Sequence, residues 1–279
     1  MNGEKNLSTR EELEKIALEM RKDVLGMALS AGPKGAHIGG SLSIIELLTV
    51  LYADIMKYDV KNPSWDERDR LILSKAHAAI GLYAALHYAG YLSDKDIEGA
   101  FKPGSNLYKH PKMNIEKGFE FSAGSLGQGL SLAVGSAIAL RNKGNSARLY
   151  VIIGDGECDE GSVWEAALSV THFGLNNICI IVDRNGLQND GTTEEIMNPC
   201  DFKNRFEVIG FEVDTVDGHD VEALRNVLNK QYNKPRVIIS NTIKGKGVSF
   251  AENNVEWHMG TVTDELYEQA MREFGNDRN

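Results

Sequence analysis

Short runs of apolar, largely β-branched residues alternate along the chain with helical patterns, and this alternation restricts the fold more than any other feature. Continuous apolar runs indicate strands buried on both faces, and strands that alternate with helices form a parallel sheet. We therefore predict an α/β fold, a doubly wound and mostly parallel sheet with helices on both faces, as a single domain over residues 1–279. The predicted strands are Leu71–Leu73, Leu149–Ile153, Ile178–Val182, Val213–Val216 and Val237–Ile239.

Apolar residues at three-to-four-residue spacing predict the helices between these strands. The segment 91–125 is mostly irregular and rich in Gly, Pro, Lys and His, and a connection of this length in a compact fold is usually functional. The predicted helices are Leu13–Met27, 41–56, 78–90, 127–142, 162–173 and 220–232, with a short helix and a frayed end over 260–279.

Charge and composition exclude several classes of protein. The formal net charge of −10 argues against nucleic acid, whose phosphates need a basic face. The sequence has no apolar run of membrane-spanning length and no signal peptide at its start. Cys158, Cys179 and Cys200 are an odd number without framework spacing, which predicts reduced thiols and a cytoplasmic protein.

The strongest motif joins the ends of two predicted strands. One strand runs into Gly154-Asp155-Gly156, and the next ends in Asp183-Arg184-Asn185. Ligands of such folds bind at the carboxyl ends of the strands, and in a βαβ unit these two ends are neighbours. Magnesium prefers oxygen ligands, and a carboxylate from Asp155, an amide oxygen from Asn185 and one main-chain carbonyl match that preference. A plain Gly-Asp-Gly turn is the structural alternative.

Four histidines lie beside glycines or in irregular segments: His37, His77, His110 and His258. Imidazole can bond to sugar hydroxyls and transfer protons near neutral pH. Each alone could be an ordinary loop or cap residue. A zinc site is disfavoured, because no His-Glu-x-x-His or Cys-x-x-Cys occurs. We predict structural roles for the remaining histidines, His87, His172 and His219.

Two glycine-rich segments complete the pattern. Gly124-Ser125-Leu126-Gly127 precedes a helix of small residues and suits close approach to a flat ring, although tight helix packing would also explain it. Lys244 follows the last strand and can face a phosphate, or can be an ordinary surface lysine. No strand leads into a dinucleotide fingerprint and no Walker-type loop occurs, which disfavours a Rossmann dehydrogenase and a P-loop enzyme.

In their order and spacing, these segments resemble the transketolase family from about residue 10 to residue 260, specifically its N-terminal diphosphate-binding domain. The resemblance implies thiamine diphosphate and Mg²⁺ as cofactors. It implies Asp155, Asn185 and the Leu187 carbonyl as metal ligands, and His37, His77, His110 and His258 as catalytic residues. It implies cofactor contacts from His77, Gly124, Ser125, Leu126, Gly156, Glu157, Asn185, Lys244 and His258. Glu160 is similar to the buried carboxylate through which the two active sites of a dimer communicate.

Transketolases are more than twice this length, so the resemblance also implies a missing half. That half would hold the aminopyrimidine-binding domain and its catalytic glutamate. We therefore expect a separate C-terminal transketolase subunit in an α2β2 assembly, with this chain inert alone. The alternatives left open are a subunit of another thiamine diphosphate enzyme, of the 2-oxo acid dehydrogenase or deoxyxylulose-phosphate synthase type, and a non-enzymatic cofactor-binding subunit. The donor sugar, ordinary, branched or sulfonated, also stays open.

Overall fold

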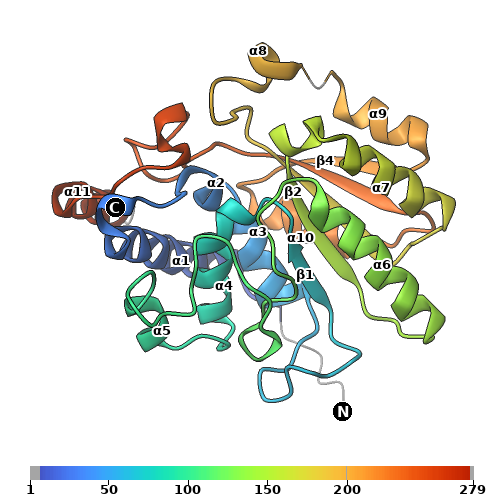
Figure 1. Ribbon diagram of the computed structural model, residues 1–279, viewed down its shortest axis with the longest axis horizontal. Helices are drawn as coiled ribbons and strands as arrows, with labels where there is room; N and C mark the ends of the chain where they lie inside the picture. The colour runs from blue at the N-terminus through green and yellow to red at the C-terminus, as the bar shows by residue number, and fades with distance from the viewer. Residues whose placement is uncertain (1–6, 199, 277–279) are drawn as a thin grey trace.

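The computed structural model describes residues 7–198 and 200–276, which fold around one parallel sheet (Figure 1). Its strand order is β1-β2-β3-β5-β4, and every neighbouring pair runs parallel. This confirms the predicted fold class, with strand ends within two residues of the expected positions. The strands are β1 (Arg70–Leu73), β2 (Leu149–Gly154), β3 (Ile178–Arg184), β4 (Glu212–Asp217) and β5 (Arg236–Asn241).

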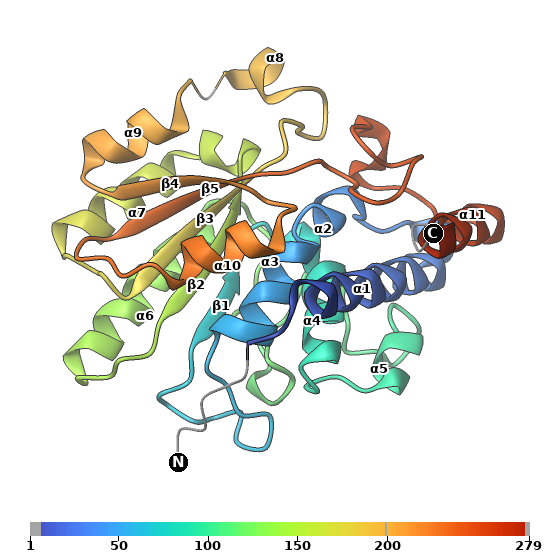
Figure 2. The ribbon, with the colours of Figure 1, turned by 180° about the vertical axis from the view of Figure 1, so that it is seen from behind.

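Helices cover both faces of the sheet, as the two opposite views show (Figures 1 and 2). Successive strand residues point to opposite faces, so Tyr150 and Ile152 pack with α1, α3, α4 and α10, while Leu149 and Val151 pack with α6, α7 and α9. The α-helices are α1 (Arg10–Ser30), α2 (Gly39–Leu42), α3 (Ile45–Val50), α4 (Ala79–Tyr88), α5 (Asp94–Glu98), α6 (Gln128–Asn142), α7 (Gly161–His172), α8 (Thr193–Met197), α9 (Phe202–Ile209), α10 (Val221–Asn229) and α11 (Asp264–Asn276).

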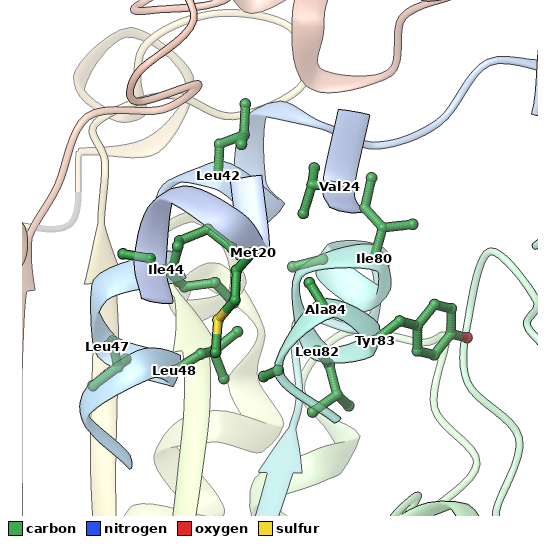
Figure 3. Packing of buried hydrophobic residues seen from close by; sticks show 14 of the residues in the cluster. Met20, Val24, Leu42, Ile44, Leu47, Leu48, Ile80, Leu82, Tyr83 and Ala84 are labelled. Carbon is green, nitrogen blue, oxygen red and sulfur yellow. The ribbon is translucent and has the colours of Figure 1, made fainter. Parts of the chain in front are cut away.

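Helix α1 begins at a capping box. Thr9 Oγ1 accepts from the Glu12 amide at 3.2 Å, and the Glu12 carboxylate accepts from the Thr9 amide at 2.7 Å. These bonds satisfy amides that a helix start leaves open. The buried face of α1 then meets α3 and α4, where Figure 3 shows Met20 and Val24 beside side chains such as Leu48 and Ile80.

The segment predicted as one helix over 41–56 is instead broken, which corrects the sequence prediction. Helix α2 ends at Leu42, α3 begins at Ile45, and a π-helical turn covers Leu51–Ile55. The Ser43 hydroxyl lies at the break and donates to Asp183 at 2.8 Å. A side chain that bonds outside the helix at this position favours a local interruption.

Helices α8 and α9 were not predicted between β3 and β4. Helix α9 buries only Phe202 and Phe206, too few apolar residues to produce a helical period. It is held by the cap at Asp201 and ends at Gly210, whose φ of 114° is left-handed. Among the described residues, no helix combines the length and the apolar character that crossing a bilayer requires.

Candidate active site at the carboxyl edge of the sheet

A cavity of about 190 Å³ opens at the edge where β1, β2 and β3 end. In β2 and β3, Gly154 is paired with Asp183, so the residues that follow both strands emerge side by side. The cavity is lined by Gly40, Lys75, His77, Leu126, Gly154, Asp155, Gly156, Glu157, Asn185, Leu187, Gln188, Asn189, Lys244 and His258.

Asp155 and Asn185 lie where the sequence predicted them, at neighbouring strand ends facing one cavity. The Asp155 carboxylate accepts the Gly156 amide at 2.9 Å and the Gly186 amide at 2.6 Å. Burial and the nearby Asp183 raise the pKa of Asp155 to about 6. Two backbone donors leave lone pairs on this carboxylate free, and a bound cation would stabilise its charge.

Asn185 has a fixed amide orientation. Its Nδ2 donates to Asp183 at 2.9 Å, and its Oδ1 accepts the Leu187 amide at 3.1 Å. The atom that faces the Asp183 carboxylate must be the amide nitrogen, because only the nitrogen can donate. The other atom is therefore the oxygen, which keeps one lone pair for another ligand. Asn185 can therefore offer an oxygen to a hard cation.

Asp183, to which the sequence assigned no role, forms hydrogen bonds with side chains from several segments at this edge. Its carboxylate is fully buried and accepts hydrogen bonds from Ser43, Thr242, Asn185 and Lys75. Burial alone would raise the pKa of Asp183, but the Lys75 ammonium and these donors hold it below its ordinary value. The ion pair with Lys75 bridges positions 108 residues apart in the chain. Lys75 also donates to the Gly40 carbonyl at 2.9 Å.

A second buried lysine, Lys244, contacts the loop that follows β3. It is buried and donates to the carbonyls of Leu187 at 3.0 Å and Gln188 at 2.9 Å. Burial and the nearby Lys75 lower the pKa of Lys244 to about 8. Among the described residues, no group of three or more His, Cys, Asp or Glu could hold a metal. A hard cation here would therefore depend on one carboxylate with amide and carbonyl oxygens, a donor set that suits Mg²⁺.

Glu157 has internal partners for both carboxylate oxygens. It accepts the Gly127 amide at 2.8 Å, the Gly154 amide at 3.1 Å and the Ser74 hydroxyl. Burial raises its pKa. Glu157 thus ties the ends of β1 and β2 to the start of α6, while the cofactor contact expected of it stays a prediction.

The four histidines singled out in the sequence form one cluster. Ring centroids lie 5.5 Å apart for His37 and His258, 5.0 Å for His77 and His258, and 5.8 Å for His37 with both His77 and His110. Burial, with His110 next, lowers the pKa of His37 to about 4; burial, with Lys244 next, does the same for His258. Burial and Lys75 also lower the pKa of His77. These three rings are therefore neutral at pH 7.

The tautomer of His258 follows from its neighbour. Its Nδ1 lies 3.0 Å from the Lys244 ammonium, which can only donate. Nδ1 must accept, so the proton of the neutral ring is on Nε2. His258 can thus present an N–H group to a substrate oxygen.

Some predicted residues lie outside the cavity. Gly124 and Ser125 are exposed, and no atom lies within 4 Å of the position that a Cβ on Gly124 would take. His110 and Glu160 are exposed as well. Lys75, Gln188 and Asn189 line the cavity without having been predicted. The position of Lys75 directly after a strand, two residues before His77, was the signal available for it.

The fold and the cavity are those of a parallel α/β protein with its candidate ligand site at the carboxyl edge of the sheet. The family model described as "Transketolase, thiamine diphosphate binding domain" matches residues 18–279. The chain belongs to the transketolase family and corresponds to its thiamine diphosphate binding domain.

Two relatives of similar length are named as subunits. The chain is 41% identical over 241 residues to the 6-deoxy-6-sulfo-D-fructose transketolase subunit SqwG of Clostridium sp. (strain MSTE9), covering 85% of this chain and 87% of that protein. It is 39% identical over 266 residues to a subunit of the apulose-4-phosphate transketolase of Phocaeicola vulgatus, covering 94% of both.

Solved transketolases share the fold over part of their length. The transketolase of Leishmania mexicana superimposes with a TM-score of 0.87 at 29% identity, over 97% of this chain and 42% of that one. The Campylobacter jejuni transketolase gives 0.86 at 32% identity, over 94% and 43%. The chain thus spans about two fifths of these enzymes.

Proposed function

We propose that this chain is the thiamine diphosphate-binding subunit of a two-subunit transketolase, which transfers a two-carbon ketol unit from a ketose to an aldose. The observation that carries the proposal is the convergence of Asp155, Asn185 and the Leu187 carbonyl on one cavity beside a buried lysine ammonium. Family membership and the subunit-length relatives support it.

In this proposal, Mg²⁺ would be held by the Asp155 carboxylate, the Asn185 amide oxygen and the Leu187 carbonyl, oxygen donors of the kind that it prefers. Gly156 and His77 would contact the diphosphate, and Lys244 would do so in exchange for its hydrogen bonds to the Leu187 and Gln188 carbonyls. A Cβ on Gly156 would lie 2.8 Å from Gln188 Cγ, so the absence of a side chain keeps this wall of the cavity close. Gly124, Ser125 and Leu126 face the rings of the cofactor, and Glu157 supports them through the Gly127 amide.

When bound, thiamine diphosphate would supply the electron sink that ketose cleavage requires. The residues of this chain bind the sugar and handle its protons. His258 donates its Nε2–H to a substrate oxygen, because its Nδ1 is occupied by Lys244. His37, His77 and His110 surround it and offer partners to donor hydroxyls. The neutral rings of His37, His77 and His258 suit this task, because a neutral imidazole can donate at one nitrogen and accept at the other.

The other half of the active site would come from a C-terminal transketolase subunit that supplies the catalytic glutamate, in an α2β2 assembly. Two observations support a partner: the chain matches only about two fifths of the solved transketolases, and two relatives of similar length are named as subunits. The exposed positions of Gly124, His110 and Glu160 are compatible with a surface that a partner covers. A cytoplasmic location stays a prediction.

The donor is proposed to be a ketose with a terminal anion, phosphate or sulfonate, because the two relatives described above are named for such substrates. Co-expression with the candidate partner, followed by assays with and without Mg²⁺ and thiamine diphosphate, tests the proposal. Donors to compare are xylulose 5-phosphate, apulose 4-phosphate and 6-deoxy-6-sulfo-D-fructose, with a 2-oxo acid as the competing class. Cofactor-dependent ketol transfer from a ketose supports the proposal, whereas turnover of the 2-oxo acid alone would overturn it.

A further inference from the structure

The loop that carries Lys244 is anchored on both sides of the lysine by side chains that share one carboxylate. On one side, the Ile243 amide donates to His219 Nε2 at 2.8 Å. On the other, Arg21 Nε donates to the Lys246 carbonyl at 3.1 Å. Glu46 joins the two anchors: its Oε1 accepts Arg21 Nη2 at 2.6 Å, and its Oε2 lies 3.0 Å from His219 Nδ1.

This network is buried and is separate from the cavity of the candidate active site. The side chains of Arg21, Glu46 and His219 are 8%, 11% and 13% exposed. Burial would raise the pKa of Glu46, but Arg21 and His219 hold it below its ordinary value, so the carboxylate is charged. None of the three lines the cavity; they border a different groove between α1 and the 246–247 segment.

The tautomer of His219 is fixed by its two partners. A backbone amide only donates, so Nε2 must carry a lone pair toward Ile243. The ring proton is therefore on Nδ1, where it is donated to Glu46. His219 thus links the charged carboxylate of Glu46, in α3, to the backbone amide of Ile243, the residue before Lys244.

The loop needs such anchors because its backbone has little regular structure. Gly245 and Gly247 flank Lys246 with φ values of 80° and 87°, a conformation that glycine also leaves easily. Further bonds hold its centre: the Gly245 amide donates to the Gly39 carbonyl, the Asn253 amide to the Lys244 carbonyl and the Gly247 amide to the Glu252 carboxylate, each at 2.9 Å. A shift of this backbone would change the position of the Lys244 ammonium relative to the carbonyls that it contacts.

We propose that His219 is a positioning residue for cofactor binding: its Nε2 accepts the Ile243 amide and so holds the Lys244 loop in the form that meets the diphosphate, while Glu46 fixes its tautomer. The inference rests on the proposed function, because it explains how Lys244 is held in position for the proposed contact with the diphosphate. Neither Glu46 nor His219 touches the cofactor in this account.

Two substitutions separate the halves of the His219 contact. In His219→Gln, the side-chain oxygen reaches the position of Nε2 and can accept the Ile243 amide. In His219→Asn, the side-chain amide reaches the position of Nδ1 and can donate to Glu46, but the Ile243 amide loses its acceptor. We expect His219→Gln to keep the affinity of the assembled complex for thiamine diphosphate and Mg²⁺ within about twofold. We expect His219→Asn to weaken this affinity roughly tenfold, which is the effect expected if the loop adopts its binding conformation about a tenth of the time.

Two further measurements on the full-length chain do not depend on activity. The ¹⁵N spectrum of the His219 ring should show the proton on Nδ1, and exchange of the Ile243 amide should accelerate in His219→Asn but not in His219→Gln. Val227→Ala in α10 is the matched control: it opens a cavity in the core without touching the loop, so it should lower stability and leave the affinity unchanged.

The results distinguish failure of the positioning role from failure of the proposed function. Affinity in His219→Asn equal to that of the unmodified chain, or a ring proton on Nε2, overturns the positioning role alone. Absence of any magnesium-dependent cofactor binding in the unmodified complex overturns the proposed function, and the positioning role with it.

Discussion

At the scale of single residues, the site depends on carboxylates that are neutralised in different ways. Asp183 is buried against a lysine and three neutral donors, whereas Asp155 has only backbone amides and a raised pKa. Glu157 is committed to scaffold donors. Of these three buried acids, the proposed metal ligand Asp155 is the one with neither a lysine nor a side-chain hydroxyl as its hydrogen-bond partner.

The Lys75–Asp183 pair leads to a prediction about stability. Asp183→Asn leaves the Lys75 ammonium buried without a counter-charge, so the free energy of unfolding should fall by about 3–5 kcal/mol. Urea denaturation measures it. Asp66→Asn is the control, because the Asp66–Lys143 pair is 57% and 62% exposed and solvent screens its charges, so its loss should change the free energy of unfolding far less. Equal losses in the two variants would contradict the account.

His258 should matter for turnover and little for cofactor affinity. Replacing it with Ala removes an N–H donor from the substrate side of the cavity, and general acid–base groups of this kind contribute about 10²–10⁴ in rate. Steady-state kinetics of the assembled complex give the rate, and titration with thiamine diphosphate gives the affinity. A loss of turnover below about threefold would exclude the role.

His37 should make stability depend on pH. Its pKa is about 4 in the folded chain, below the ordinary value of 6.5 that it regains on unfolding, and the groups around it are His77, His110, His258, Lys109 and Lys244. The unfolded chain binds more protons between these values, so this contribution to stability is lost as pH falls below 6.5. In His37→Gln, the free energy of unfolding should change less between about pH 6.5 and 4 than in the unmodified chain. Identical slopes would show that His37 does not titrate as described.

At the scale of secondary-structure elements, α6 shows how closely helices approach the active edge. A Cβ on Gly129 would lie 2.5 Å from Ser74 Oγ and 2.8 Å from Ser74 Cα, at the end of β1. Gly135, in the same helix, has no atom within 4 Å of that position and is exposed. Packing against Ser74 therefore requires glycine at position 129, whereas no such contact requires it at position 135.

These two glycines form a matched pair for a stability test. Gly129→Ala should destabilise the chain by about 1–3 kcal/mol, because α6 must move away from β1. Gly135→Ala should stabilise it by about 0.5–1 kcal/mol through the lower helix propensity of glycine. Thermal and urea unfolding measure both, and changes of the same sign would contradict the packing described here.

The sequence predicted what local patterns encode. Strands β1, β2, β3 and β5 were evident because burial leaves continuous apolar runs, whereas β4 lies at the sheet edge and buries only Val216. Asp155 and Asn185 were evident because both follow strand ends. The pairings of Lys75 with Asp183 and of Glu46 with His219 could not be predicted, since each joins residues more than a hundred positions apart. The break at Ser43 has the same origin, because its hydroxyl bonds to Asp183 across the sheet.

At the scale of the whole molecule, the chain has the thiamine diphosphate binding domain of a transketolase at about two fifths of the length of the solved enzymes. One edge of its sheet gathers the proposed metal ligands, a buried lysine and four histidines. Away from the cavity, Glu46 bonds to Arg21 and His219, the two side chains that anchor the Lys244 loop. The proposed partner would close this edge and bring the remaining catalytic group.

Titration calorimetry of the assembled complex with thiamine diphosphate tests the central claim most directly. The account predicts uptake that requires Mg²⁺, is abolished by Asp155→Ala, and is unchanged in Asp66→Ala, which removes an exposed acid that does not line the cavity. Uptake that is independent of Mg²⁺, or that persists in Asp155→Ala, would contradict it.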